Sequence, residues 1–184
     1  MRGTQAKDEL LEGCRGKSLD AFERLYEEHG TRMKSIARNI LGSASDAEDA
    51  VQDAFLKVYR GIEHFRGGSA FATWVYRILV NSCYDLLRRN RRRAELPLPA
   101  KIALARTSAP DHPLRLSIES ALSRLEERER TAFLLCEVEG LSHREAGEIL
   151  EVSENASRAL LFKARRRMQQ QLRAANAFAP EGAS

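Results

Sequence analysis

The stretch from Asp46 to Arg93 reads DAEDAVQDAFLKVYRGIEHFRGGSAFATWVYRILVNSCYDLLRRNRRR. It begins with an acidic amphipathic helix and passes through a turn rich in glycine and aromatic residues. It ends in a helix whose last turns carry an arginine cluster, namely Arg88, Arg89, Arg91, Arg92 and Arg93. Arginine clusters suit phosphate, which would repel the acids at the start of the stretch. We therefore expect two different partners, a basic protein surface for the acidic helix and a nucleic acid for the arginines.

The hydrophobic pattern around this stretch predicts a bundle of three helices. Apolar residues recur at spacings of three and four, and the helices that they predict cover residues 19–41, 46–60 and 69–93. Gly42 ends the first helix, and Ser45 with Glu48 forms a capping-box pattern at the start of the second. The acids of the second helix then fall mostly on its outer face. Three packed helices of this kind form a first module.

A cluster of prolines divides the chain in two. Four of the five prolines lie in one short stretch, at Pro97, Pro99, Pro110 and Pro113, which marks a linker. The composition elsewhere favours an all-α fold. We predict two small helical domains joined by a flexible linker, divided into an N-terminal extension at 1–16, a first domain at 17–93, the linker at 94–113, a second domain at 114–173 and a disordered tail at 174–184.

The second domain has the pattern of a helix-turn-helix. Ser142 and Glu145 form a capping box for a short helix that ends near Leu150. Ser153 then offers an N-cap for a longer final helix, which runs to about Leu172. Generic helical bundles reproduce this spacing, so the pattern alone does not decide between a DNA-binding motif and a simple bundle.

The composition of the final helix favours DNA binding. Between Arg158 and Arg173 it has six basic residues and no acid, which makes it a basic surface. The residues that could face a major groove are Arg158, Phe162, Lys163, Arg165 and Arg166. The residues that should pack inward are Leu160, Leu161, Ala164 and Met168.

Each signal in the first domain also has a structural alternative. The acids could form a solvated helix face, and the arginines could favour a helix C-terminus, although five arginines in six residues exceed what that effect needs. Phe65 lies in a turn without a periodic partner, so it could stack on an unpaired base or pack back onto the core. Asn81 could read a base edge or bond locally. Trp74 is by default a core aromatic residue.

Several classes of protein lack support in the sequence. Cys14, Cys83 and Cys136 lie far apart without CxxC or Cys-His spacing, so we predict neither a disulfide framework nor a zinc site. There is no glycine-rich phosphate loop, nucleophile elbow or His-acid pair at metal spacing, so we predict no enzyme, cofactor or metal. There is no run of about 18 apolar residues and no apolar signal core, so we expect a protein of the reducing cytoplasm.

Three motifs together resemble those of the extracytoplasmic-function (ECF) sigma factors, with the envelope-stress type as the best match. They are DAEDAVQDAFLKVY at 46–59, FRGGSAFATWVYRILVN at 65–81, and EGLSHREAGEIL with LLFKARRRM near the C-terminus. The resemblance covers residues 17–172 in the right order, linker included. It implies sigma domain 2 followed by sigma domain 4, and a non-enzymatic factor that directs core RNA polymerase to promoters. The implied partners are the polymerase clamp coiled coil and flap, promoter DNA, and an anti-sigma factor that holds the protein, at the inner membrane where that factor is membrane-bound.

The resemblance also implies roles for individual residues. Those at polymerase-binding positions are Asp46, Asp49, Gln52, Asp53, Phe55 and Tyr59. Those expected to hold a flipped base or the backbone of the minus-ten element are Phe65, Arg66, Trp74, Asn81, Ser82, Arg88 and Arg89. Those that match the minus-thirty-five recognition helix are Arg158, Phe162 and Lys163, to which the basic face adds Arg165 and Arg166.

The chain departs from the family pattern in the helix-turn-helix. Glu151 replaces the usual turn glycine, Ala156-Ser157 replaces a typical Thr-Val, and Leu160 stands where a basic residue is common. Losing the glycine costs little if the backbone there avoids positive φ. The other changes suggest a promoter preference that differs from that of the family's best-known members.

Two other functions compete with this interpretation. A stand-alone helix-turn-helix regulator would bind duplex DNA tightly without polymerase, but it leaves the acidic helix and the aromatic loop without a purpose. A nucleic-acid enzyme would use the carboxylates with a divalent metal, and its activity would require the Asp49 carboxylate.

Overall fold

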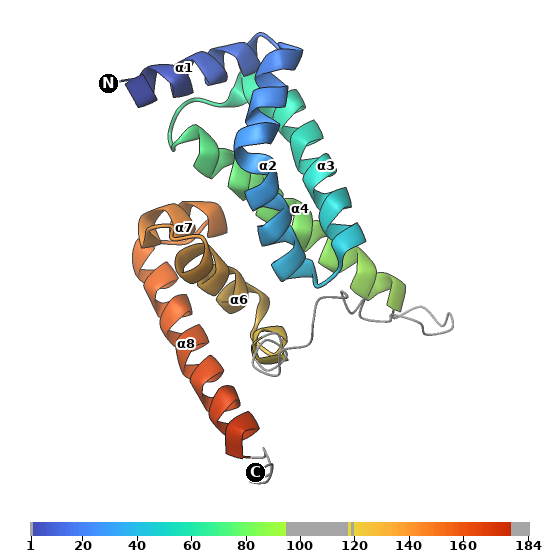
Figure 1. Ribbon diagram of the computed structural model, residues 1–184, viewed down its shortest axis with the longest axis vertical. Coiled ribbons are helices and arrows are strands. Elements are labelled where there is room, and N and C mark those ends of the chain that lie inside the picture. The colour runs from blue at the N-terminus through green and yellow to red at the C-terminus, as the bar shows by residue number, and fades with distance from the viewer. Residues whose placement is uncertain (1, 95–117, 119, 178–184) are drawn as a thin grey trace, which may run out of the picture. The chain divides into compact units, whose positions relative to one another are not determined.

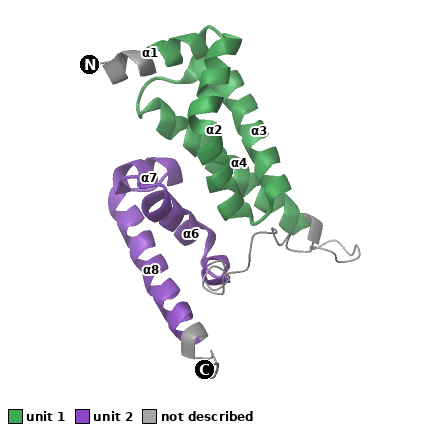
Figure 2. Ribbon diagram, viewed as in Figure 1, with its two compact units in different colours: residues 1–105 green, residues 106–184 purple. Residues whose placement is uncertain are grey.

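The computed structural model describes the backbone of residues 2–94, 118 and 120–177, and the side chains of 9–92, 118 and 120–174. Every regular element in these ranges is a helix. The chain divides into two compact units, residues 1–105 and 106–184 (Figure 2). The prediction of an all-α fold with two helical domains is therefore confirmed. The predicted linker at 94–113 lies outside the described residues, apart from the backbone of Ala94.

Three helices of the first unit pack side by side, as predicted: α2 (Leu19–Leu41), α3 (Ala44–Gly61) and α4 (Phe71–Ala94) (Figure 1). They bury the apolar faces that the sequence spacing indicates, including Leu25, Met33, Ile36, Val51, Val58 and Leu79. Gly42 ends α2 in the left-handed region at a φ of 72°, and its N–H bonds the Arg38 carbonyl oxygen at 2.8 Å. Glycine adopts this conformation without the steric penalty of a Cβ atom.

The N-cap of α3 is Ser43, and the prediction of Ser45 was wrong. The Asp46 N–H donates to Ser43 Oγ at 3.3 Å, while Ser45 lies inside the first turn of the helix. Both serines have an acid three residues later, so the local pattern does not choose between them. Ser43 directly follows Gly42, where α2 ends, so the next helix starts at the first cap available.

The N-terminal extension forms a helix that the sequence analysis missed. Helix α1 (Arg2–Arg15) packs against α2, and its Leu10 and Cys14 are buried. The packing is close, because a Cβ atom on Gly13 would lie 2.7 Å from the Ala21 Cβ. The spacing of Leu10 and Cys14 was the available signal, but the pattern is too short to be decisive.

The second unit is built on α6 (Glu127–Phe133), the π-helical turn η2 (Leu134–Val138), α7 (His143–Leu150) and α8 (Glu154–Ala177). Residues 118 and 120–123 are also helical. One apolar cluster of this unit consists of Ala121, Leu125, Ala164 and Met168. The buried Glu129 carboxylate meets the Arg167 guanidinium at 2.7 Å and thereby ties α6 to α8. Helix α8 continues into the first residues of the predicted tail.

Candidate functional site

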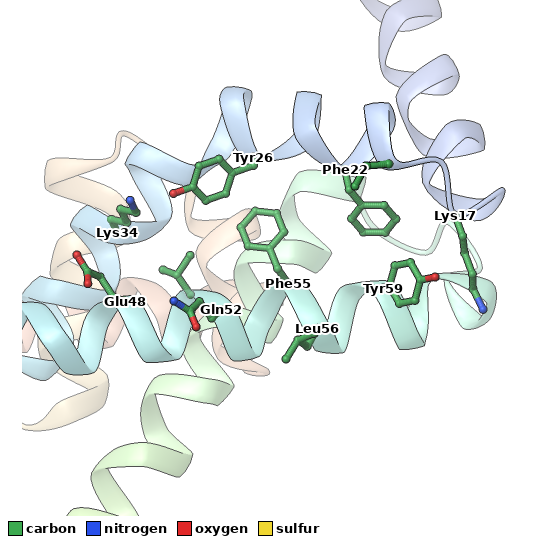
Figure 3. Close-up of a pocket in the computed structure, with 11 residues that line it drawn as sticks. Lys17, Phe22, Tyr26, Lys34, Glu48, Gln52, Phe55, Leu56 and Tyr59 are labelled. Atoms are coloured by element: carbon green, nitrogen blue, oxygen red, sulfur yellow. The ribbon is translucent and has the colours of Figure 1, made fainter.

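An aromatic groove of about 880 Å³ lies between α2 and α3. Figure 3 shows Phe22 beside Tyr59 and Tyr26 beside Phe55, with ring centroids 5.2 and 5.4 Å apart. Tyr26 and Tyr59 are exposed at this groove, and exposed aromatic side chains that gather in one place are typical of a protein-binding surface. Three residues at predicted polymerase-binding positions line it, namely Gln52, Phe55 and Tyr59.

The acids of α3 differ in how they are held. Asn90 of α4 donates to the Asp46 carboxylate at 3.3 Å, and Lys57 Nζ lies 2.8 Å from the Asp53 carboxylate. Asp46 and Asp53 are half-buried, whereas Asp49 is exposed. The expectation that the acids of α3 share an outer face therefore holds for Glu48 and Asp49, which are both exposed, while Asp46 and Asp53 are engaged within the first unit.

Lys57 joins α3 to α4 in a polar network. Its Nζ donates to Ser82 Oγ at 3.0 Å and lies 3.3 Å from the Asp85 carboxylate. Burial alone would raise the pKa of the Asp53 carboxyl, but hydrogen bonds with Lys57 and Ser82 outweigh it, so the pKa lies below its usual value. The pKa of Lys57 is raised, because its bonds to the two carboxylates outweigh the effect of burial.

The arginines at the end of α4 border the same network. A polar groove of about 330 Å³ is lined by Asp53, Lys57, Asp85, Arg88, Arg89 and Arg92. Arg88 pairs with Asp85, while Arg88 and Arg89 keep exposed side chains. The cations predicted to hold phosphate therefore lie next to acids, which reduces the local positive charge.

Phe65 packs back onto the core, which was one of its two predicted alternatives. Its side chain is 6% exposed, and its ring centroid lies 5.2 Å from that of Trp74 and 5.6 Å from that of Phe71. Ser82 is also buried. In this conformation neither side chain is available to DNA. The rings of Phe71 and Trp74 pack on Phe65, and the Ser82 hydroxyl accepts a hydrogen bond from Lys57.

Two other predicted minus-ten residues, Arg66 and Asn81, are exposed. Arg66 follows Phe65 in the loop before α4, and Asn81 lies in the middle of α4. Trp74 is half-buried in the aromatic cluster with Phe65. The first unit thus presents polar groups around an aromatic cluster, not an open aromatic platform.

The predicted recognition surface on α8 is open to solvent. Arg158, Phe162, Lys163, Arg165 and Arg166 are all exposed, with Phe162 at 68%. On the opposite side, Leu161, Ala164 and Met168 are buried and Leu160 is half-buried. The helix therefore has the basic outer face and apolar inner face that its sequence predicts.

The turn between α7 and α8 follows the predicted caps. The Glu145 N–H donates to Ser142 Oγ, and the Glu145 carboxylate accepts from the Ser142 N–H at 2.9 Å. Ser153 Oγ accepts from the Ala156 N–H at 3.1 Å. A Cβ atom on Gly147 would lie 2.9 Å from the Val152 carbonyl oxygen, so the turn folds tightly over α7.

Glu151 adopts a φ of 56° and a ψ of 45° at the end of α7. The missing glycine would cost little only if the backbone here avoided positive φ, and that condition is not met. A residue with a Cβ atom is strained in this left-handed region. The helix-turn-helix therefore keeps the turn geometry typical of glycine with a glutamate in its place.

Comparisons with known proteins agree with this two-unit arrangement. Residues 25–93 match the family model described as Sigma-70 region 2, and residues 115–168 match the one described as Sigma-70, region 4. The chain is 31% identical to the ECF RNA polymerase sigma factor SigM of Mycobacterium tuberculosis (strain ATCC 25618 / H37Rv) over 167 residues, which cover 91% of this chain and 85% of SigM. The chain belongs to the ECF sigma factors of RNA polymerase. This sigma factor therefore serves transcription initiation, and the family indicated by its motifs is confirmed.

Two further relatives support the assignment. This sigma factor is 32% identical to the ECF RNA polymerase sigma-E factor of Escherichia coli (strain K12) over 170 residues, which cover 85% of this chain and 88% of that protein. It also resembles the solved structure of CnrH in complex with the cytosolic domain of CnrY. The TM-score is 0.71 at 27% identity, with coverage of 92% of this chain and 98% of CnrH. The region 2 match begins at residue 25, so α1 lies outside it.

The three cysteines of this sigma factor are free thiols. Cys14 and Cys83 are buried and Cys136 is half-buried. Burial raises the pKa of all three thiols, that of Cys83 to about 12. In the described part of the chain, no three His, Cys, Asp or Glu side chains converge as metal ligands. None of the helices described is long and apolar enough to cross a membrane.

Proposed function

We propose that this sigma factor divides promoter recognition between its two units without supplying a catalytic group. The first unit binds core RNA polymerase through α3 and the aromatic groove and holds the minus-ten strand with α4 and the preceding loop. The second unit reads the minus-thirty-five duplex with α8. The observation that carries this proposal is the separation of an exposed aromatic groove, lined by Gln52, Phe55 and Tyr59, from the arginine-lined groove beside α4.

Docking on polymerase depends on both apolar area and charge. Exposed aromatic side chains supply the area, and Asp49 supplies an exposed negative charge for a basic partner surface. Reversal of this charge in Asp49→Lys should weaken binding to core polymerase about tenfold or more, because like charges then meet at the interface. A fluorescence titration of labelled protein with core enzyme measures this affinity.

The matched control is Glu27→Lys, which reverses an exposed charge on α2 outside the lining of the groove. It should leave the affinity unchanged. Equal affinities for the Asp49→Lys variant and the original protein would show that α3 is not the docking face.

Capture of the minus-ten strand would use the exposed polar residues around the aromatic cluster. Arg66 and Asn81 can bond a base or the backbone, and Arg88 and Arg89 can bind phosphate. Flipping a base costs a few kcal/mol, which polar contacts to the base and to its backbone would have to offset. Asn81→Ala should reduce open-complex formation at unchanged polymerase affinity, as measured by a fluorescent base within the minus-ten element. Normal opening would remove Asn81 from this role.

Recognition at minus thirty-five would use the open face of α8. Arg158→Ala should lower transcription about tenfold or more from a promoter that requires the minus-thirty-five box, because a bidentate base contact is worth about 1–3 kcal/mol. Run-off transcription on promoters with and without the box measures this difference. An equal loss on both promoters would indicate a non-specific electrostatic role, and tight duplex binding without polymerase would favour a stand-alone regulator.

A regulatory protein would complete this assignment. CnrH was solved in complex with the cytosolic domain of CnrY, and the first unit here offers an exposed aromatic groove that a partner can cover. We include an anti-sigma factor of this kind among the partners of the chain. Competition between such a factor and core polymerase, measured with labelled protein, tests whether both use the groove.

A further inference from the structure

Two residues, one at the end of α1 and one just after it, contact the segment that leads into the Phe65 loop. Arg15 Nη2 donates to the Phe65 carbonyl oxygen at 3.0 Å, and Lys17 Nζ lies 2.7 Å from the Glu63 carboxylate. Glu12 also bonds Arg15, at 2.8 Å, which fixes the direction of the guanidinium. The pKa of Lys17 is raised by its hydrogen bond to Glu63, and that of Glu63 is lowered by the same bond.

The backbone of Lys17 gives a second, independent observation. Lys17 adopts a φ of 56°, the left-handed conformation that glycine favours after a helix. Its N–H bonds the Cys14 carbonyl oxygen at 3.0 Å. A lysine in this position has a conformational cost that a glycine would avoid, and such strain is typical of positions where the side chain is needed.

These contacts hold only the Phe65 side of the loop. Gly67 has a φ of 76°, and a Cβ atom at Gly67 or Gly68 would meet no other atom within 4 Å, so the distal part of the loop is open. The Phe65 side, by contrast, is fixed by its ring packing on Trp74 and by Arg15 on its carbonyl oxygen. A loop that is ordered before binding loses less conformational entropy when it captures a ligand.

We propose that Arg15 and Lys17 are positioning residues that hold the Phe65 loop ready for capture of the minus-ten strand. This inference rests on the proposed function of the first unit. Helix α1 then acts as a brace on the loop between α3 and α4. Neither residue needs to touch DNA, because each acts through Glu63 or through the backbone of Phe65.

The brace can be tested in the free protein, without polymerase. Trp74 is the only tryptophan of the chain, and its ring contacts Phe65 at a centroid distance of 5.2 Å. Release of the loop in Glu63→Lys or Lys17→Glu should therefore raise acrylamide quenching of Trp74 and shift its emission to the red. The double variant, Lys17→Glu with Glu63→Lys, restores opposite charges and should return both signals to their original values.

The functional test uses preassembled holoenzyme, so that differences in polymerase affinity do not enter. Glu63→Lys adds positive charge, which by electrostatics alone should strengthen binding to nucleic acid. The brace predicts the opposite result, a loss of open complexes of about two- to fivefold, the range expected for an exposed ion pair. Open-complex formation should return to its original level in the double variant. Arg15→Gln should also lose open complexes, while Arg24→Gln, an exposed charge loss on α2, should not.

The outcomes separate this inference from the proposed function. If holoenzyme with the original protein forms no open complex, the proposed function is wrong. The Trp74 quenching and emission of the free protein then test by themselves whether Arg15 and Lys17 hold the loop. If the original protein opens the promoter and Glu63→Lys opens it equally well, the positioning role is wrong. Failure of the double variant to restore Trp74 emission would overturn the brace itself.

Discussion

The two units differ in what their predicted contact residues do before any partner arrives. In the first unit, Asp53 is paired with Lys57 and Phe65 is buried against Trp74. In the second unit, the corresponding residues of α8 are exposed, and Phe162 is largely in solvent. The first unit must therefore give up buried contacts to make external ones, whereas the second has to give up only the exposed ion pairs of Arg158 with Glu154 and of Arg165 with Glu137.

This difference has an energetic consequence. A side chain that leaves an internal partner to bind an external one contributes only the difference between the two interactions. Substitutions in the first unit should therefore change stability and binding together. Substitutions on the exposed face of α8 should change mainly binding, because its ion pairs are exposed and contribute little to stability, which makes the two units separable by experiment.

The largest expected effect comes from the two aromatic residues at predicted DNA positions. Phe65→Ala should lower the free energy of unfolding of the first unit by about 3 kcal/mol, because it removes a buried ring. Phe162→Ala should change stability by less than about 0.5 kcal/mol, because its ring is exposed. Urea unfolding, followed by Trp74 fluorescence for the first unit and by circular dichroism for the whole chain, measures both values. If the two substitutions lower the unfolding free energy equally, the two units do not differ in how their aromatic residues are held.

Local sequence patterns predicted the second unit more completely than the first. The capping box at Ser142, the cap at Ser153 and the inward face of α8 depend on residues within one or two turns, and each is found as predicted. The position of Phe65 depends on Phe71 and Trp74, and that of Asp53 on Lys57 and on residues of α4. Such tertiary partners leave no periodic signal, so the sequence could only offer alternatives for them.

Backbone conformation was the other property that the sequence did not predict. Glu151 and Lys17 both have a φ of 56°, although neither is a residue type that favours the left-handed region. Both residues follow the end of one helix and lie within a few residues of the next, so the chain has to change direction there. Helix α1 escaped prediction for a related reason, since its burial depends on contact with α2.

The next largest effect tests how tightly the second unit is packed at its turn. Gly147→Ala should lower the unfolding free energy of this unit by about 2 kcal/mol, because the new Cβ would meet the Val152 carbonyl oxygen, a backbone atom that cannot move alone. Transcription from promoters that need the minus-thirty-five box should fall with it. The control is Gly68→Ala in the first unit, where a Cβ atom meets open space. If Gly147→Ala leaves the unfolding free energy unchanged, the turn is looser than this contact implies.

A smaller effect tests the polar network of the first unit. Lys57→Met should cost about 1 kcal/mol or less at neutral pH, because solvent screens these half-exposed ion pairs. The lowered pKa of Asp53 means that its stabilisation is present above the unfolded value of 3.8 and is lost as pH falls through the lower folded value. The raised pKa of Lys57 means that its stabilisation is present below 10.5 and is lost as pH rises through the higher folded value.

Unfolding free energies of the original protein and Lys57→Met should therefore differ at neutral pH and converge in strong acid. Lys163→Met, which removes an exposed lysine from α8, should show no such dependence on pH. A constant difference between the original protein and Lys57→Met down to strong acid would show that the lysine stabilises the unit by apolar packing of its stem and not by charge.

The smallest effect concerns the strained turn and has the opposite sign. Glu151→Gly should raise the unfolding free energy of the second unit by about 0.5 kcal/mol, since relief of about 1–2 kcal/mol of left-handed strain is partly offset by the greater chain entropy of glycine. Glu148→Gly, within α7, should instead lower it by about 1 kcal/mol. If Glu151→Gly is stabilising and leaves transcription intact, the strain has no function. If Glu151→Gly is stabilising but weakens use of the minus-thirty-five box, Glu151 holds α8 at an orientation that a more flexible turn would lose. DNA binding by the second unit would then depend on this strained turn as well as on the exposed face of α8.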